Sequence, residues 1–131
     1  MALCLIASGK ATAWALTAFT LSWTHSVEKV RWEEDWRVTA AGLELVAARI
    51  RGSAAGMEVP DGAVLQDGVW HYAPTLPVQK ALVLARSGAT GAGWSLCSSA
   101  GCIEIGRRSA APVELRSCDM VPVPFSGADR Q

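Results

Sequence analysis

The run from Phe19 to Val38, FTLSWTHSVEKVRWEEDWRV, alternates between apolar and polar residues in both of its halves. Alternation with a period of two predicts two half-buried β-strands, because successive side chains of a strand point to opposite faces. A turn near Glu28 and Lys29 would join the strands into an antiparallel hairpin. The predicted inner faces hold Phe19, Leu21, Trp23, His25 and Val27 in the first strand and Val30, Trp32, Glu34, Trp36 and Val38 in the second.

Two polar residues, His25 and Glu34, interrupt these apolar faces. With the turn near Glu28, they lie diagonally across the hairpin and within reach of each other. Burying either group alone is costly, so we expect the two side chains to satisfy each other or to hold something between them. The outer face of the second strand is different, and we predict a solvated cross-strand charge ladder there, formed by Arg31, Glu33, Asp35 and Arg37.

Turn-forming residues recur about every ten residues along the rest of the chain, a spacing typical of β-sandwiches and small barrels. Asp67-Gly68 predicts a further hairpin. The segment from Ala40 to Ile50 has a composition that favours helix, but Gly42 interrupts its start. We predict a strand there, with Leu43, Leu45 and Ala47 on one face. The sequence therefore indicates an all-β fold, a small antiparallel sandwich or partly open barrel of about eight to ten short strands.

The length of 131 residues predicts a single domain over residues 1–118. Residues 119–131 contain Pro122, Pro124 and Gly127, and we expect a flexible C-terminal tail. Half of the residues are hydrophobic, so a packed core is expected. Most of the six tryptophans fall on predicted strands and would fill that core, a carbohydrate-binding platform being the alternative: Trp23, Trp32, Trp36, Trp70 and Trp94.

The charge balance gives no sign of a charged partner. Twelve basic residues match twelve acidic ones and no Lys/Arg cluster occurs, so nucleic-acid binding is not expected. No apolar run reaches the roughly 18 residues of a membrane helix, so membrane insertion is not expected. The N-terminal MALCLIASGK lacks the basic region of an export signal. The default expectation is a cytoplasmic protein, or a periplasmic one if the start is truncated.

Four cysteines occur, and Cys97 and Cys102 are separated by Ser-Ser-Ala-Gly in a segment that resembles a hairpin. A disulfide between these two is geometrically possible. Cys4 and Cys118 would meet if the terminal strands are neighbours. Sequence alone does not choose among the three possible pairings, and free thiols remain open. Zinc binding is weakly supported, because no second close cysteine pair and no neighbouring histidine accompany the motif.

The segments THSVEKVRWEEDW, ARIRGSAAGMEVPDGA and GVWHYAP resemble, in this combination, the bacterial family known as domain of unknown function 1850. The resemblance extends from about Leu3 to Cys118. The family pattern has a His-Ser-Val segment, an acid about nine residues later and a glycine-rich loop. Its positions in this chain are His25-Ser26-Val27, Glu34 and Gly52-Ser53-Ala54-Ala55-Gly56.

One departure from the family pattern is Ala54, which stands where the loop has its central glycine. An alanine would be strained there if that position needed a positive φ. Members of the family often lie beside genes for tripartite ATP-independent periplasmic (TRAP) transporters of the TAXI subclass. The resemblance therefore implies an accessory link to solute uptake and no established activity.

The candidate site combines His25 and Glu34 with the loop from Gly52 to Met57, including Ser53 and Gly56. The pair would be structural if it only fixes the strand register. As a binding site, the loop N–H groups and His25 would hold a small anionic solute, or the surface would bind a partner protein.

An enzyme is the less favoured reading of this site. A small hydrolase or metal-dependent enzyme would use Ser53, His25 and Glu34. No catalytic residue, metal ligand or cofactor is assigned, and the sequence does not indicate the oligomeric state.

Overall fold

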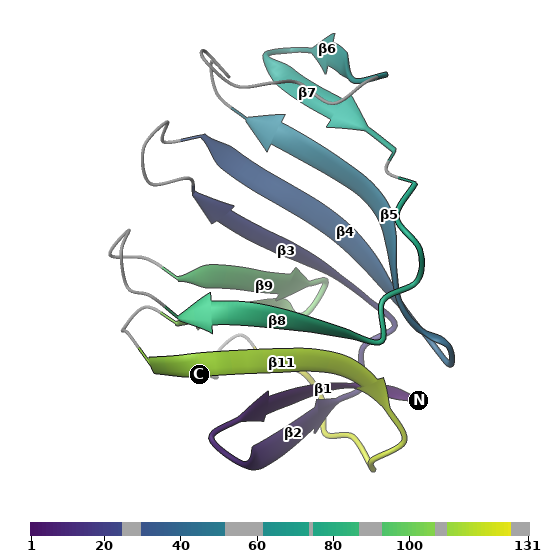
Figure 1. The fold of residues 1–131 in the computed structure, drawn as a ribbon, viewed down its shortest axis with the longest axis vertical. Helices are drawn as coiled ribbons and strands as arrows, with labels where there is room; N and C mark the ends of the chain where they lie inside the picture. Colours follow the sequence, from purple (N-terminus) through teal and green to yellow (C-terminus); the bar gives the residue numbers. More distant parts are fainter. Residues whose placement is uncertain (25–29, 52–61, 74, 87–92, 107–109, 127–131) are drawn as a thin grey trace.

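The protein is a sandwich of two antiparallel β-sheets in the computed structural model, which describes residues 1–24, 30–51, 62–73, 75–86, 93–106 and 110–126 (Figure 1). The described residues form eleven strands and no helix, so the predicted all-β sandwich is confirmed, with one strand more than expected. No helix that could cross a membrane occurs among them. The four-stranded sheet has the order β2 (Lys10–Trp14), β1 (Ala2–Ala7), β11 (Ala110–Cys118) and β8 (Ala81–Arg86). The seven-stranded sheet has the order β10 (Gly101–Ile105), β9 (Trp94–Ser98), β3 (Ala18–Thr24), β4 (Arg31–Thr39), β5 (Gly42–Arg51), β7 (Val69–Tyr72) and β6 (Val64–Gln66).

The hairpin predicted at Asp67-Gly68 joins β6 to β7. Both turn residues have positive φ, 52° at Asp67 and 77° at Gly68, as a two-residue type I′ turn requires. Glycine adopts this conformation without steric cost, and aspartate is among the residues that tolerate it. The turn is therefore set locally by these two residues.

The segment expected between Ala40 and Ile50 is strand β5, but a bulge divides its inner face. Asp35 of β4 pairs with Ala47, whereas its neighbour Trp36 pairs with Leu45. Val46 is thus the extra residue, and its side chain is 43% exposed. A bulge shifts the alternation by one residue, so Ala47 leaves the face that Leu45 occupies. The prediction that these two residues share a face was wrong for that reason.

The main hydrophobic core lies between the sheets. Its largest fully buried side chain is Trp14 of β2, and Trp36 of β4 is only 3% exposed. The cluster takes residues from both sheets but none from β6 or β7. In Figure 1 the seven-stranded sheet extends at its β7–β6 end past the four-stranded sheet. The two sheets therefore cover each other over only part of the larger one.

The first and last strands are neighbours, since β1 pairs along its length with β11. Cys4 and Cys118 are joined by a disulfide there, and Cys97 is joined to Cys102 across the β9–β10 hairpin. The described residues contain no free cysteine. The pairing of β1 with β11 thus brings Cys4 and Cys118 together, a contact that the spacing of the cysteines in the sequence did not determine.

The segment after residue 118 packs against the first hairpin as far as the structure describes it. Val123 exchanges backbone hydrogen bonds with Ala13 and Ala15 on either side of Trp14, at 2.9 and 3.0 Å. Phe125 is 7% exposed and meets the Trp14 ring edge-on at 5.3 Å. The hydrophobic core therefore includes Phe125, past the predicted domain boundary at residue 118, and the flexibility of the tail stays a prediction. Residues 127–131 lie outside the described part.

Candidate functional site

Glu34 lies on the inner face of β4, between Trp32 and Trp36. Its partners in the neighbouring strands are Leu21 of β3 and Ala48 of β5, and Ala48 in turn pairs with Tyr72 of β7. Residues paired across antiparallel strands point to the same face of the sheet. Glu34 and Tyr72 therefore stand on either side of the small, fully covered Ala48, which is 1% exposed.

Glu34 is a partly desolvated carboxyl group with little compensation from described residues. Burial raises its pKa above the usual value, and the hydrogen bond donated by Trp36 Nε1, at 3.3 Å, offsets this only in part. The pKa of Tyr72 is also raised, first by burial and then by the negative charge of Glu34. The two groups are thus close enough to influence each other electrostatically. A ligand that donates a hydrogen bond would stabilise the ionised form of Glu34.

Tryptophan rings surround this acid on the same face. Trp23 and Trp32 are paired across β3 and β4, and their rings stack at 6.1 Å with an interplanar angle of 10°. Trp70 of β7 lies opposite Ile50, which itself lies opposite Trp32. We call the group formed by Trp23, Trp32, Glu34, Trp70 and Tyr72 the aromatic face.

The tryptophans of the aromatic face are less covered than the core tryptophans. Trp36 is buried as predicted, but Trp23 and Trp32 are half-buried, so the prediction of burial holds only in part for them. Nevertheless the Trp32 Nε1 atom is buried, and no hydrogen-bond acceptor within the described residues reaches it. A buried N–H without an acceptor costs on the order of 1–3 kcal/mol. Among the described residues, the aromatic face therefore combines an under-compensated acceptor, Glu34, with a covered donor, Trp32 Nε1, that has no acceptor.

The predicted partners of Glu34 are not tested by the structure, because His25, Gly52, Ser53 and Gly56 lie outside the described residues. The hairpin register bears on the reasoning, however. A turn near Glu28 would place Trp23 opposite Glu34, whereas the structure places Leu21 there and pairs Trp23 with Trp32. The register on which we based the predicted His25–Glu34 contact is therefore not the register of the structure. The contact itself stays a prediction.

The sequence reasoning missed Tyr72 as a neighbour of Glu34. The alternation in Val69-Trp-His-Tyr72 does place Trp70 and Tyr72 on one face. What it does not show is that this strand pairs with β5, which is a non-local pairing. The same pairing puts His71 opposite Arg49 on the outer face.

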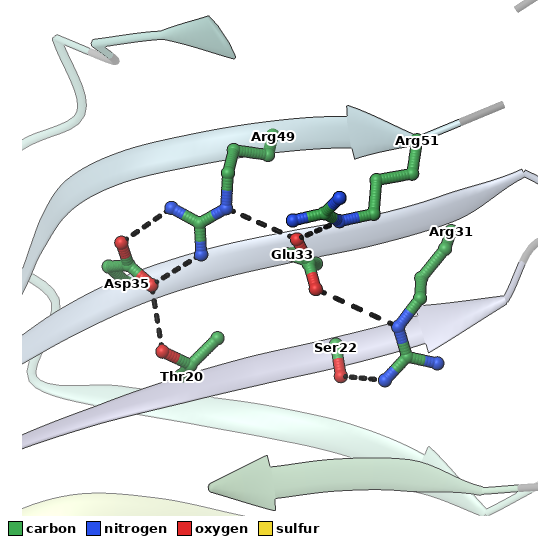
Figure 2. Close-up of polar contacts among 7 residues, drawn as sticks. All are labelled: Thr20, Ser22, Arg31, Glu33, Asp35, Arg49 and Arg51. Carbon is green, nitrogen blue, oxygen red and sulfur yellow. Dashed lines mark hydrogen bonds and ion pairs between the residues drawn. The ribbon is translucent and has the colours of Figure 1, made fainter. Parts of the chain in front are cut away.

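The outer face of β3, β4 and β5 carries the predicted charge ladder, with additional partners from β5 (Figure 2). Arg49 donates a hydrogen bond from each terminal nitrogen to the Asp35 carboxylate, at 2.6 and 2.8 Å. Thr20 donates a further hydrogen bond to Asp35 at 2.8 Å. These contacts hold the pKa of Asp35 below its usual value, chiefly through the Arg49 hydrogen bonds, with burial acting against them. Both oxygens of Asp35 are thus engaged.

Glu33 is the second centre of this network (Figure 2). It accepts hydrogen bonds from Arg49 at 3.1 Å and from Arg51 at 2.8 Å, and Arg31 lies 3.8 Å away. Burial alone would raise the pKa of Glu33, but the bonds from Arg51 and Arg49 outweigh it and lower the pKa. Arg31 also donates to Ser22 at 2.7 Å. The ladder was predicted from β4 alone. The prediction did not include Arg49 and Arg51, because the register between β4 and β5 was not known from the sequence.

No group of three or more histidine, cysteine, aspartate or glutamate side chains that could hold a metal ion occurs in the part of the chain that the structure describes. The described polar clusters are carboxylate–arginine networks, whose oxygens are already paired with cations. Their geometry is that of a structural surface network.

The comparison with family models gives one match, to the family described as Domain of unknown function (DUF1850), over residues 19–105. The chain belongs to this family. No curated protein and no solved structure matches the chain. The matched region of the DUF1850 domain runs from β3 to β10 and contains Glu34 and the whole seven-stranded sheet except Ala18. Strands β1, β2 and β11 lie outside the match and complete the second sheet.

Proposed function

We propose that this DUF1850 domain is a non-enzymatic binding domain whose site is the aromatic face. The observation that carries the proposal is Glu34, a half-buried carboxyl group with a raised pKa and one described donor, Trp36 Nε1. Binding sites typically combine apolar and aromatic walls with a few polar groups that orient the ligand. The half-buried tryptophans supply such walls, and Tyr72 supplies a further polar group.

The described residues favour a ligand that donates hydrogen bonds to Glu34. An ionised carboxylate repels an anion unless a cation stands beside it. If the aromatic face binds a small anionic solute, the hydrogen-bond donors would have to come from His25 and from the loop between Gly52 and Met57. A partner protein that inserts a polar side chain between the tryptophans would use the same acceptor.

The proposal also includes an accessory role beside a TRAP transporter of the TAXI subclass, which the family resemblance implies. A small binding domain is chemically suited to such a role, because it needs affinity for a solute or a transporter component and no catalysis. Co-purification with the transporter proteins, or a shared solute, would support this link. Absence of both would remove it and leave the binding site itself unaffected.

The alternative function is a small hydrolase or metal-dependent enzyme that uses His25, Glu34 and Ser53. Of these residues only Glu34 is described, and its described donor is a tryptophan, so no observation favours this alternative over binding. A serine enzyme would react with a phosphonate probe, and a metal enzyme would retain stoichiometric metal after purification.

Thermal-shift screening of small amines, polyols and carboxylates tests the proposed function, since a ligand that binds only the folded state raises the unfolding midpoint. A true ligand should also change the tryptophan fluorescence, and both responses should be lost in Glu34→Gln. Glu114→Gln is the matched control, because Glu114 lies on β11 and pairs with Arg116 at 3.3 Å. If every active compound keeps its effect on Glu34→Gln, the site is not the aromatic face.

A further inference from the structure

A shallow hollow of about 410 Å³ opens on the outer face of the seven-stranded sheet, opposite to the aromatic face. Its floor is formed by the alternating outward residues Ala18 and Thr20 of β3 and Asp35 of β4. One wall is formed by the end of β9, with Cys97 and Ser98, and by the adjoining Ser99, and the other by Arg37 and the bulge residue Val46. Ala18, a small residue, lies opposite Arg37 in the strand pairing.

The charge within this hollow is dominated by Arg37. Asp35 also lines it, but the two hydrogen bonds from Arg49 and the one from Thr20 already occupy both of its oxygens. Arg37 has only a loose ion pair with Glu44, at 3.8 Å, and these two side chains are 58% and 43% exposed. An exposed pair of this kind contributes at most about 1 kcal/mol. The guanidinium can therefore exchange Glu44 for another carboxylate at little cost.

The remaining lining gives a surface for an apolar group. Ala18, Val46 and Cys97, which is joined to Cys102 by a disulfide, line the hollow. Val46 is 43% exposed although it is a large apolar residue, because the bulge turns it outward. A volume of this size lies in the range of small-molecule sites.

We propose that this hollow binds a small monocarboxylate with a short apolar body. The carboxylate pairs with Arg37 through two parallel hydrogen bonds, the arrangement that a guanidinium favours. The apolar body lies over Ala18 and against Val46 and the disulfide. The inference does not rest on the proposed role of Glu34, since the hollow opens on the opposite face of the sheet and Glu34 does not line it.

Hexanoate is the probe, with hexanamide as its neutral counterpart, and binding is followed by backbone and arginine side-chain NMR shifts on the whole chain. We expect binding on the order of millimolar, because one exposed ion pair and a short alkyl chain give only a few kcal/mol. The shifts should concentrate at Ala18, Thr20, Arg37 and Ser99. Hexanamide should bind about threefold to fivefold more weakly, because it lacks the charge that pairs with Arg37.

Variants of the two charged residues should act with opposite signs. Arg37→Gln should weaken hexanoate binding about threefold to fivefold, since it removes the charged partner of an exposed ion pair. Glu44→Gln should strengthen binding by about twofold to fivefold, because it removes the carboxylate that competes for Arg37. Arg51→Gln is the control, since Arg51 is an arginine of similar exposure that pairs with Glu33 outside the hollow, and it should leave binding unchanged.

Ala18→Val tests the shape of the site without changing its charge. Ala18 is exposed, and valine is favoured in strands, so folding should be retained while the floor is filled and binding is lost. Hexanoate binding that is undiminished in Arg37→Gln or in Ala18→Val would overturn the proposal. So would equal binding of hexanamide, a weakening in Glu44→Gln, or no binding at tens of millimolar hexanoate.

Discussion

At the scale of single residues, the adjacent carboxyl groups of Glu34 and Asp35 have pKa values that are shifted in opposite directions. Asp35 points to the outer face and is gripped by Arg49, so its pKa is lowered. Glu34 points to the inner face, where burial raises its pKa and one indole N–H is the described donor. The alternation of the strand separates the two environments completely, although the residues are neighbours in the chain.

Glu34→Gln should stabilise the protein slightly at neutral pH. A raised folded-state pKa means that the folded protein binds the proton more tightly, so stability falls as the pH rises through the unfolded and folded pKa values. A glutamine does not ionise, so this pH-dependent loss of stability is removed, and its side-chain oxygen can still accept the hydrogen bond from Trp36 Nε1. Urea unfolding at neutral pH and below pH 4.5, the ordinary value for Glu34, should show a difference from wild type that shrinks on acidification.

Glu34→Ala is the matched variant, because it leaves the Trp36 N–H without its acceptor. It should be less stable than Glu34→Gln by about 1–3 kcal/mol. Equal stability of the two variants would show that the bond at 3.3 Å contributes nothing to folding.

Asp35→Asn should destabilise the protein at neutral pH by about 1 kcal/mol, a modest value because Asp35 is partly exposed and its charge is screened. The folded-state pKa is lowered, so the stabilisation is present above the unfolded pKa and is lost as the pH falls through the folded one. Wild type and variant should therefore converge at low pH. A pH-independent difference in their urea midpoints would contradict the role of the Arg49 pair.

At the scale of elements, the start of β5 links the two sheets. Leu43 exchanges two backbone hydrogen bonds with Gln79, at 2.7 and 2.8 Å, just before β8 enters the four-stranded sheet. The contact requires Gly42, whose φ is +143° and whose Cβ, if present, would collide with the Gln79 carbonyl oxygen. One glycine thus permits the close approach on which the connection between sheets depends.

Gly42→Ala should destabilise the protein by about 2 kcal/mol or more, because it adds a backbone collision to an unfavourable φ. Gly9→Ala is the control, since Gly9 also has positive φ, +78°, but open space around the added Cβ. It should cost about 1 kcal/mol. Thermal unfolding midpoints compare the two, and an equal loss in both would mean that the contact with Gln79 is unimportant.

At the scale of the whole molecule, the disulfide between Cys4 and Cys118 closes almost the entire chain, with a sequence separation of 114. It joins β1 to β11, two of the three strands that lie outside the matched family region. Two disulfides with no free cysteine among the described residues are typical of proteins that fold in an oxidising compartment. We therefore predict such a compartment, against the default expectation from the N-terminal sequence.

Removing the Cys4–Cys118 bond by double substitution to alanine should cost more stability than removing the Cys97–Cys102 bond. The chain-entropy estimate is about 4–5 kcal/mol for a loop of the first size and about 2 kcal/mol for one of five residues. Denaturant midpoints of the two double variants test the order. Thiol titration of denatured, unreduced protein from an oxidising compartment should find no free thiol, and four free thiols would contradict the prediction.

Local pattern was sufficient for the parts of this fold that depend on neighbours in the chain. The alternation from Phe19 to Val38 predicted β3, β4 and the inward position of Glu34, and Asp67-Gly68 predicted its hairpin, because side-chain direction and turn conformation are set within a few residues. Local pattern did not predict four other features: the pairing of β5 with β7, the bulge at Val46, the hydrogen bonds from Arg49 to Asp35 and the packing of Phe125 on Trp14. Each depends on which strands lie side by side, and that is fixed by long-range packing and register, so only the folded structure placed Tyr72 near Glu34 and Arg37 beside a hollow.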